Sequence, residues 1–304
     1  MKGIDLFAGA GGTTTGAKQA GIDMIWAANH SPIAVDFHSR NHPEVIHQCQ
    51  DLCQADWSDV PSHDILFASP CCQGHSRAAG KKKTTKKADK SRSTAWAVVD
   101  CLEAHRTPVC IVENVPDFLN WQLYNAWECA MHALGYALSI NPINACNLGI
   151  PQNRNRLFIV ATRSMHPIEL KLANETMVPA RTIVDLSEEG YEWDLVSSRV
   201  PATQRRVANG HKSFGEAFLD AAYGSSRNGH SLDKPLCTIT CVNKHSLVIG
   251  DKIRPLTCQE LAAAQTFNED YIWPSSKVAT KTMIGNAVPP KMAQKVTEAV
   301  LRAL

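Results

Sequence analysis

Two adjacent cysteines, Cys71 and Cys72, are the side chains of this sequence best suited to nucleophilic chemistry. They follow an apolar run, Ile65–Ala68, that has the length of a buried strand. In open α/β sheets, ligands bind beyond the carboxyl ends of the strands, so a thiol at this point is well placed to meet one. Cysteine is also among the most buried residue types, and by itself the pair would more often be inert packing. The other polar residues of the chain have to decide between these interpretations.

A carboxylate and two guanidinium groups are the next candidates. Glu113 directly follows a second apolar run, residues 109–112, which predicts a catalytic acid or base on the same sheet edge as the cysteines. Gln152, Arg154 and Arg156 alternate along the chain, so we expect them on one face of an extended segment. Guanidinium groups there can meet a phosphate or a base carbonyl, although a structural ion pair is an equally simple role for one of them.

A glycine turn near the start of the chain predicts a ligand that approaches the backbone closely. Residues 3–7 have the character of a strand and residues 13–20 that of a helix, and the turn between them is rich in glycine. Thr14 stands where the dinucleotide fingerprint needs its third glycine. The next strand ends in Asn29 and His30, without the acid that holds a ribose. A nicotinamide dehydrogenase is therefore disfavoured, while an ordinary tight turn stays open.

A strongly basic run follows the cysteines. Between Arg77 and Arg92 the sequence has eight Lys or Arg residues, and Asp89 is the single acid. Gly80 and the threonines predict a loop rather than a helix. Such a run can be a solvated surface or a localisation signal. Its place directly after a candidate nucleophile favours a clamp on phosphates.

Length and composition set the remaining limits. With 304 residues and 44% hydrophobic content, the chain is long enough for about two domains. No run approaches the roughly 18 apolar residues of a membrane span, and the first residues do not read as a signal peptide. The eleven cysteines are scattered, which predicts a reducing, cytoplasmic setting. They also lack the spacing of a zinc site, so we expect no metal. The net charge of only +2 does not by itself indicate a nucleic-acid partner.

The order of elements predicts an α/β fold with a doubly wound, mostly parallel sheet, helices on both faces, and a second, smaller domain. We expect the larger domain at 1–170 and 279–304, and the smaller one at 171–278, because residues 166–250 show weak periodicity and many polar side chains. The predicted helices include residues 93–105, 117–134 and 257–266, with a turn over 282–290 before a closing helix.

Taken in order, these blocks resemble the DNA (cytosine-5) methyltransferase family. The matching blocks are residues 5–12, Cys72-Gln73, and residues 113–115, 152–156, 254–257 and 285–288. Together they cover nearly the whole chain outside residues 166–250. The resemblance implies a class I methyltransferase, Rossmann-like fold with a target-recognition domain. It also implies methyl transfer from S-adenosylmethionine to carbon 5 of a flipped-out cytosine in duplex DNA, through a covalent cysteine adduct.

The resemblance further implies a role for individual residues. The family's nucleophile directly precedes Gln, which favours Cys72, while Cys71 stands where the family commonly has proline. The implied catalytic residues are Cys72, Glu113, Arg154 and Arg156. The implied cofactor-binding residues are Leu6, Phe7, Gly9, Gly11, Gly12, Asn29, His30, Asp51, Leu52, Pro70, Asn286 and Ala287. The implied DNA-binding residues are Ser76, Arg77, Lys81, Lys82, Lys83, Arg92 and Gln152.

One departure from the family concerns the cofactor. Asn29 aligns where the family often has a ribose-binding glutamate, so we expect weaker binding of S-adenosylmethionine and greater tolerance of an anionic analogue. Two other functions stay open: a tRNA cytosine-5 methyltransferase, and a non-enzymatic binding protein of the same fold. We expect double-stranded DNA as the partner of a bacterial or phage-encoded monomer, and a cognate restriction endonuclease beside it.

Overall fold

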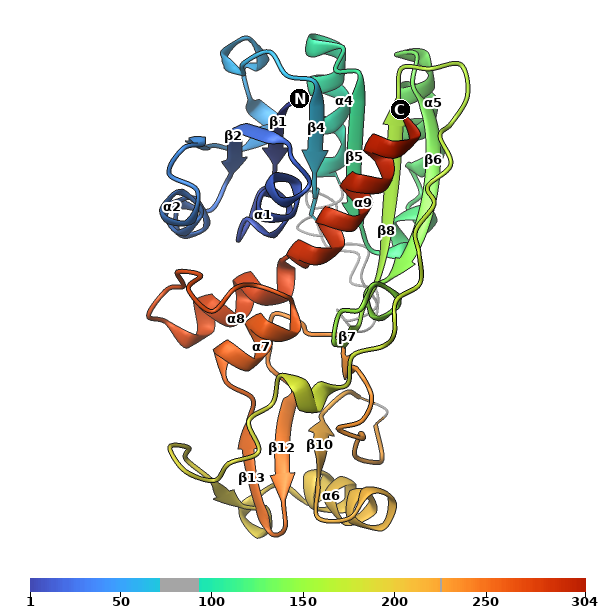
Figure 1. Ribbon diagram of the computed structural model, residues 1–304. Coiled ribbons are helices and arrows are strands. Elements are labelled where there is room, and N and C mark those ends of the chain that lie inside the picture. The colour runs from blue at the N-terminus through green and yellow to red at the C-terminus, as the bar shows by residue number, and fades with distance from the viewer. Residues whose placement is uncertain (72–92, 225) are drawn as a thin grey trace. The chain divides into compact units, whose positions relative to one another are not determined.

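The computed structural model describes residues 1–71, 93–224 and 226–304 of the chain (Figure 1). It divides into two compact units. We call residues 1–144, 155–173 and 287–304 the larger unit, and residues 145–154 and 174–286 the smaller unit. The boundaries expected from the sequence assign residues 145–154 and 279–286 to the larger domain, whereas their contacts place them in the smaller unit.

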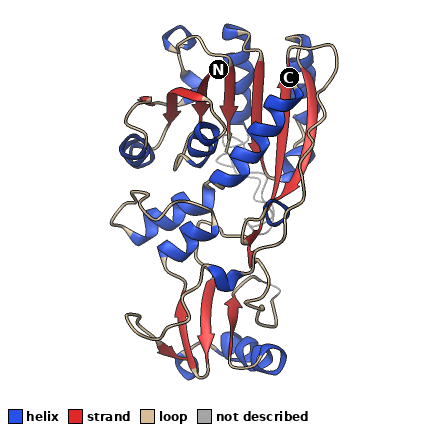
Figure 2. Cartoon of the chain, in the orientation of Figure 1, coloured by secondary structure: helices blue, strands red, loops and turns tan. Residues whose placement is uncertain are grey.

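The larger unit contains a seven-stranded sheet with the order β3-β2-β1-β4-β5-β8-β6 (Figure 2). Only β8 runs antiparallel to its neighbours, β5 and β6. The order of the strands reverses between β1 and β4, and in open α/β sheets this switch point is where ligands bind. The mostly parallel α/β sheet expected from the sequence is therefore confirmed. The strands are β1 (Lys2–Leu6), β2 (Asp23–Asn29), β3 (Ile46–Cys49), β4 (Ile65–Ala68), β5 (Val109–Asn114), β6 (Ala137–Asn144) and β8 (Asn155–Thr162).

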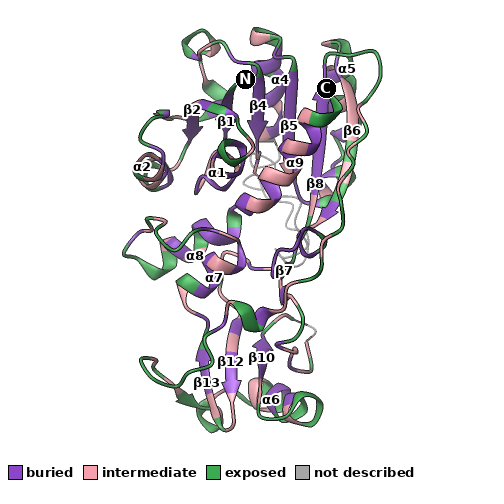
Figure 3. Ribbon diagram, viewed as in Figure 1, coloured by how far each residue is buried: buried purple, intermediate pink, exposed green. Residues whose placement is uncertain are grey.

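Helices cover both faces of this sheet because successive strand residues point to opposite sides. On one face, Leu66 and Cys110 belong to a core cluster with residues of α4 and α5. Figure 3 shows that β4 and β5 are largely buried. On the other face, Phe67 and Ile111 line a pocket together with α9. α9 also packs on α1, where a Cβ on Gly16 would overlap the carbonyl oxygen of Pro290. The helices are α1 (Gly12–Gln19), α2 (Pro32–Asn41), α4 (Trp96–His105), α5 (Tyr124–Ala133) and α9 (Pro290–Ala303).

The smaller unit is built on a four-stranded antiparallel sheet with the order β10-β12-β13-β9. Its strands are β9 (Asp194–Leu195), β10 (Ala217–Ala221), β12 (His245–Ile249) and β13 (Lys252–Pro255), and β7 (Gln152–Asn153) pairs separately with β11 (Leu236–Cys237). Its helices are α6 (Pro201–Phe214), α7 (Cys258–Ala264) and α8 (Lys277–Asn286). The larger unit also has short 3₁₀ turns at Leu52–Gln54, Trp57–Asp59, Ser93–Ala95 and Pro116–Asn120. In the smaller unit such turns span Ala145–Leu148, Ala180–Thr182 and Val196–Ser198. Across the described ranges, we find no helix with the length and apolar content needed to cross a membrane.

Two predicted elements are wrong. The single helix expected over 117–134 is broken, because Phe118 and Trp121 turn into the core from a 3₁₀ segment before α5 begins. The turn expected over 282–290 is in part the end of α8. Gly285 suggested a turn, but in the structure it lies in α8. Glycine is needed there because a Cβ would overlap the backbone of Thr240 and Cys241. In both places tertiary packing overrides the local preference.

Candidate active site

The carboxyl edge of the larger sheet gathers the chemistry-bearing residues of β1, β4 and β5. The parallel register pairs Leu6 with Ala68, and Ala68 with Val112. The residues that follow these positions are Phe7, Ser69 and Glu113, so all three lie at one edge of the sheet. The structure therefore brings Glu113 to the same edge as the segment that leads to the cysteines.

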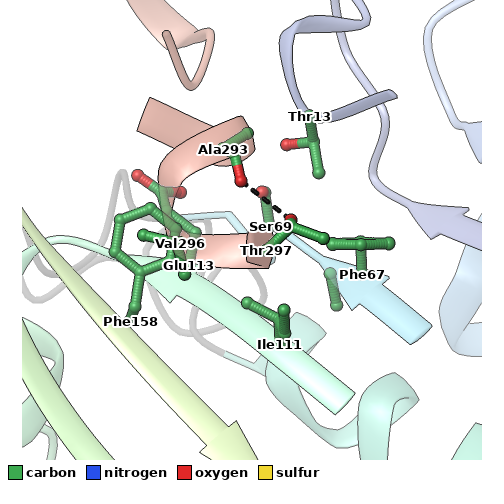
Figure 4. A pocket seen from close by; sticks show the side chains of 10 residues that line it. Thr13, Phe67, Ser69, Ile111, Glu113, Phe158, Ala293, Val296 and Thr297 are labelled. Atoms are coloured by element: carbon green, nitrogen blue, oxygen red, sulfur yellow. Dashed lines mark hydrogen bonds between the residues drawn. The ribbon is translucent and has the colours of Figure 1, made fainter. Parts of the chain in front are cut away.

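A pocket opens at this edge, between the ends of β4 and β5 and the helices α1 and α9 (Figure 4). Its walls are mainly apolar, and its polar side chains are Thr13, Ser69, Glu113 and Thr297. The hydroxyl of Thr297 donates to the carbonyl oxygen of Ala293, 2.8 Å away, and is thereby occupied within α9. The remaining lining residues are Phe67, Ala68, Ile111, Phe158, Ala293 and Val296.

Glu113 and Arg156 form an ion pair in this region. The Nε of Arg156 lies 2.9 Å from Oε1 of Glu113, and their side chains are only 12% and 13% exposed. Antiparallel pairing of β5 with β8, which sets Asn114 opposite Leu157, brings the two side chains together. The guanidinium group also donates through Nη1 to the carbonyl oxygen of Asn155. The ion pair therefore fixes both side chains at the carboxyl edge of the sheet.

Two residues that the sequence analysis did not single out hold the chain at Pro70 and Cys71. Nδ2 of Asn114 donates to the carbonyl oxygen of Pro70, 3.1 Å away, and the backbone nitrogen of Cys71 donates to Oγ1 of Thr94 at 3.0 Å. Asn114 directly follows Glu113 and belongs to the matching block 113–115, which was the signal for it in the sequence. Cys72 itself, with Ser76, Arg77, Lys81, Lys82, Lys83 and Arg92, lies outside the described residues.

Gln152 and Arg154 belong to a different environment from Arg156. Both are buried in the smaller unit, at 0% and 1% exposure. Oε1 of Gln152 accepts from the backbone nitrogen of Ile239, and Arg154 donates to the carbonyl oxygens of Ile239 and Gly285 at 2.9 and 3.0 Å. We expected Gln152, Arg154 and Arg156 on one face of an extended segment. In the structure Gln152 and Arg154 contact the smaller unit, whereas Arg156 contacts Glu113.

The glycine turn after β1 has a backbone geometry that lets a ligand approach the main chain closely. Phe7, Gly9 and Gly11 all have positive φ, at 62°, 53° and 87°, and Gly11 caps α1. The left-handed region is easy for glycine but rare for a bulky residue such as Phe7. Strain of this kind gathers at ligand sites, which supports a ligand at the turn. Leu6 and Gly12, at its two ends, are buried.

The other predicted cofactor residues lie on both units. Asn29 ends β2, is 9% exposed, and its Oδ1 accepts from the backbone nitrogen of Ser31 at 2.9 Å. Asp51 is exposed and caps the turn that begins at the buried Leu52, while His30 is exposed and Pro70 buried. Asn286 belongs to the smaller unit, where its Oδ1 accepts from Sγ of Cys241, and Ala287 belongs to the larger unit. Within the described ranges, no His, Cys, Asp and Glu side chains form a group of three or more arranged to hold a metal ion.

A mostly parallel sheet, a strained glycine turn after β1 and a carboxylate–guanidinium pair at the carboxyl edge define a Rossmann-like enzyme with a nucleotide-type ligand at this edge. The family model of C-5 cytosine-specific DNA methylases matches residues 1–302, and the chain belongs to that family. The resemblance found in the sequence is confirmed. The chain is accordingly a DNA (cytosine-5) methyltransferase with S-adenosylmethionine as methyl donor.

Individual relatives are similar over almost their whole length. A Type II methyltransferase of Haemophilus parahaemolyticus, M1.HphI, is 27% identical over 98% of this chain and 86% of its own. M.HgiDI of Herpetosiphon aurantiacus is 28% identical over 96% of this chain and 92% of its own. Among solved structures, an E. coli prophage protein described as a DNA modification methyltransferase has a TM-score of 0.74 at 16% identity, and covers 100% of this chain and 99% of its own.

Proposed function

We propose that Cys72 attacks carbon 6 of a cytosine that has been flipped out of duplex DNA. The observation that carries this assignment is the Glu113–Arg156 pair at the sheet edge, beside a segment that Asn114 ties down at Pro70. A free thiol has a pKa of about 8.5, so the nucleophile depends on its surroundings to become a thiolate. Addition of the thiolate makes carbon 5 electron-rich and divides one difficult step into two easier ones.

Glu113 and Arg156 act on the charge that this addition creates. Negative charge develops on the ring, and a proton held between Glu113 and ring nitrogen 3 stabilises it. Arg156 then binds the carbonyl oxygen of the base. After methyl transfer the proton on carbon 5 leaves, and the sulfur–carbon bond breaks to release the thiolate.

The glycine turn and its neighbours hold the cofactor, which supplies a methyl group on a sulfonium sulfur. The positive φ of Phe7, Gly9 and Gly11 opens the turn to close approach, which suits a nucleoside ligand. Most of the residues assigned to this site lie at or just after the carboxyl ends of β1, β2, β3 and β4, and two lie just before α9. The full set is Leu6, Phe7, Gly9, Gly11, Gly12, Asn29, His30, Asp51, Leu52, Pro70, Asn286 and Ala287.

Arg154 is a positioning residue in this proposal. Its two hydrogen bonds fix the backbone at Ile239 and Gly285, so it supports the smaller unit rather than the reacting base. Gln152 has the same surroundings, and its buried amide supports the loop more directly than it reaches DNA. The smaller unit serves as the target-recognition domain, and the basic residues between 76 and 92 grip phosphates.

The cellular setting is proposed on the same basis. The relatives named as Type II methyltransferases support a cytoplasmic enzyme of bacterial or phage origin that works beside a cognate restriction endonuclease. A monomer is sufficient, because one chain supplies every residue of the proposed site.

Transfer of labelled methyl groups tests the proposal. We expect label on duplex DNA rather than tRNA, and a trapped adduct with duplexes that contain 5-fluorocytosine. Cys72→Ser should abolish both turnover and trapping, and Cys71→Ser should preserve them. Label on tRNA alone would favour the tRNA enzyme, and DNA binding without trapping would favour a non-enzymatic protein.

An anionic cofactor analogue is the second candidate, and Asn29 is the observation that favours it. The amide at the end of β2 lacks the negative charge of a ribose-binding acid, and its Oδ1 is already bonded to the backbone of Ser31. Calorimetric titration of wild type and Asn29→Glu with both ligands checks it. We expect the substitution to strengthen binding of S-adenosylmethionine and weaken that of the analogue, and unchanged affinities would contradict the idea.

A further inference from the structure

Four side chains form a continuous line of hydrogen bonds beside the glycine turn, and the proposed reaction uses none of them. Oγ1 of Thr14 lies 2.8 Å from Oδ2 of Asp5 and 3.0 Å from Nε2 of His38. Nδ1 of His38 lies 2.7 Å from Nε2 of His47. Asp5, Thr14 and His38 are buried, with at most 1% exposure, whereas His47 is partly exposed. The line therefore leads from the surface to a fully buried carboxyl group.

Both ends of the glycine turn are attached to this line. Asp5 lies in β1 just before the turn, and Thr14 lies in the first turn of α1 just after it. Their hydrogen bond closes the loop that contains Gly9 and Gly11. A change in the charge of Asp5 therefore acts directly beside the backbone assigned to the cofactor.

The line has two complete arrangements that differ by one proton. When Asp5 is ionised, Thr14 donates to it, Nε2–H of His38 donates to Thr14, and Nε2–H of His47 donates to Nδ1 of His38. When Asp5 is protonated, every donor reverses: Asp5 donates to Thr14, Thr14 to Nε2 of His38, and Nδ1–H of His38 to Nε2 of His47. In this second arrangement Nδ1 of His47 carries the proton that it lacks in the first. When His47 takes up a proton from solvent and all three hydrogen bonds reverse, the net result is one additional proton, and Asp5 becomes protonated.

Electrostatics place the exchangeable proton on Asp5. Burial raises the pKa of Asp5 to about 7, and the hydrogen bond from Thr14 opposes this only in part. Burial also holds the pKa of His38 well below its usual value and lowers the pKa of His47. The carboxyl group therefore titrates near neutral pH while both imidazoles stay uncharged.

The surrounding charged groups reinforce this distribution. His42 packs beside His38 at a ring-centroid distance of 4.8 Å, and burial followed by the charge of Lys18 lowers its pKa to about 4. Lys18 of α1 lowers the pKa of His38 as well, and it pairs with Glu44, whose charge raises the pKa of His42 and His47. The cationic form is thus disfavoured throughout the cluster.

We propose that Asp5, Thr14, His38 and His47 form a proton relay that couples the charge of Asp5 to the charge of the ligand in the cofactor site. This inference rests on the proposed cofactor site. A sulfonium cation beside the turn favours the carboxylate, because opposite charges attract strongly where water is excluded. Asp5 then releases its proton through Thr14, His38 and His47 to solvent. The thioether product lacks the positive charge on sulfur, so Asp5 takes the proton back when the product replaces the cofactor.

Calorimetry in buffers of different ionisation enthalpy measures this coupling without any turnover. At pH 7 we expect binding of S-adenosylmethionine to release up to about half a proton, because a carboxyl group with a pKa of about 7 is half protonated there. Binding of S-adenosylhomocysteine should release none. Equal proton release for the two ligands would overturn the coupling, and no binding of either would instead count against the proposed function.

Two substitutions assign the released proton. Asp5→Asn keeps the size of the side chain but cannot ionise, so the release should be lost while the variant still binds cofactor. His63→Asn is the matched control, since Nε2 of His63 lies 2.8 Å from Oγ1 of Thr107 and its Nδ1 faces the carbonyl oxygen of Pro61. This pair includes none of the four side chains of the line and no carboxyl group, so the variant should release as much as wild type. Undiminished release in Asp5→Asn would refute the assignment to Asp5.

The route is tested by kinetics. After rapid mixing with cofactor in the presence of an indicator dye, wild type should release its proton in the same fast phase as binding. His47→Gln removes the exit, and we expect this fast phase to be lost while the final amount of proton released stays the same. An unchanged fast phase in a folded His47→Gln variant would show that the proton leaves by another route.

Discussion

Arg156 and Glu113 are joined at 2.9 Å across the antiparallel pair β5–β8, a contact that depends on the single reversed strand of the sheet. A parallel strand at that place would begin at the opposite edge. Because β8 runs the other way, its first residues lie beside the last residues of β5. The reversal therefore places a cation one strand away from the carboxylate of Glu113, which we propose meets the base.

Glu113→Gln tests the role of the carboxylate. We expect methyl transfer to fall by about 10²- to 10⁴-fold, the usual contribution of a positioned acid or base, with cofactor binding unchanged. Single-turnover labelling and calorimetry measure the two quantities. Glu103→Gln, on the exposed side of α4, should behave as wild type. A Glu113→Gln enzyme with normal turnover would contradict the assignment.

Arg154→Met tests whether this residue positions the smaller unit or contacts the base. Loss of its donors leaves the buried carbonyls of Ile239 and Gly285 without these partners, so unfolding should become easier by about 1–3 kcal/mol for each. Denaturant titration measures this, and Arg205→Met on the exposed face of α6 is the control. A large loss of turnover at full stability would instead indicate a direct catalytic role.

Gly285→Ala tests the contact between α8 and the loop before β12. Its Cβ would overlap the backbone of Thr240 and Cys241, so we expect a loss of about 1–3 kcal/mol in the free energy of unfolding. Thermal and urea unfolding provide the measurement. Gly224→Ala has open space around its Cβ and should cost little. Equal stability of the two variants would show that the loop yields easily.

The buried histidines predict acid sensitivity. Burial lowers the pKa of His42 from 6.5 to about 4, so between these values the unfolded chain binds more protons than the folded one. The stability that His42 contributes is present above pH 6.5 and is lost as the pH falls toward 4. Asp5 works in the opposite sense, because its raised pKa favours the folded state as the pH falls below about 7.

Comparison of wild type with His42→Asn isolates the contribution of His42 to the pH dependence of stability. Urea midpoints measured from pH 7.5 to 4.5, the range that brackets the usual histidine pKa of about 6.5, should fall less steeply for His42→Asn than for wild type. His166→Asn, which changes an exposed histidine, should follow the wild-type curve. Parallel curves for all three proteins would rule out His42 as a source of the acid sensitivity.

The sequence predicted the parts of the molecule that depend on local pattern. Apolar runs indicated the buried strands β4 and β5, and the glycines between 9 and 12 indicated the turn before α1. Glu113 could be placed at the sheet edge because strand ends align in parallel sheets. These inferences need only the local pattern of apolar residues and glycines and the direction of the strands.

Other features depend on tertiary contacts and left little local signal. Helix α6 was missed because few of its residues are buried, and Arg206, which forms a buried pair with Asp220, looks polar in the sequence. Arg154 and Arg156 look equivalent by spacing, yet one contacts the smaller unit and the other contacts Glu113. The hydrogen-bonded line from Asp5 to His47 joins four separate elements, so spacing along the chain could not reveal it.

The packing of Gly16 against Pro290 has a consequence for how the protein is made. Helix α9, which provides Ala293 and Val296 to the pocket, leaves the ribosome only after all of residues 174–286 have been translated. A nascent chain therefore carries an unfinished pocket throughout synthesis of the smaller unit. An interrupted translation product would therefore lack the wall of the pocket that α9 provides.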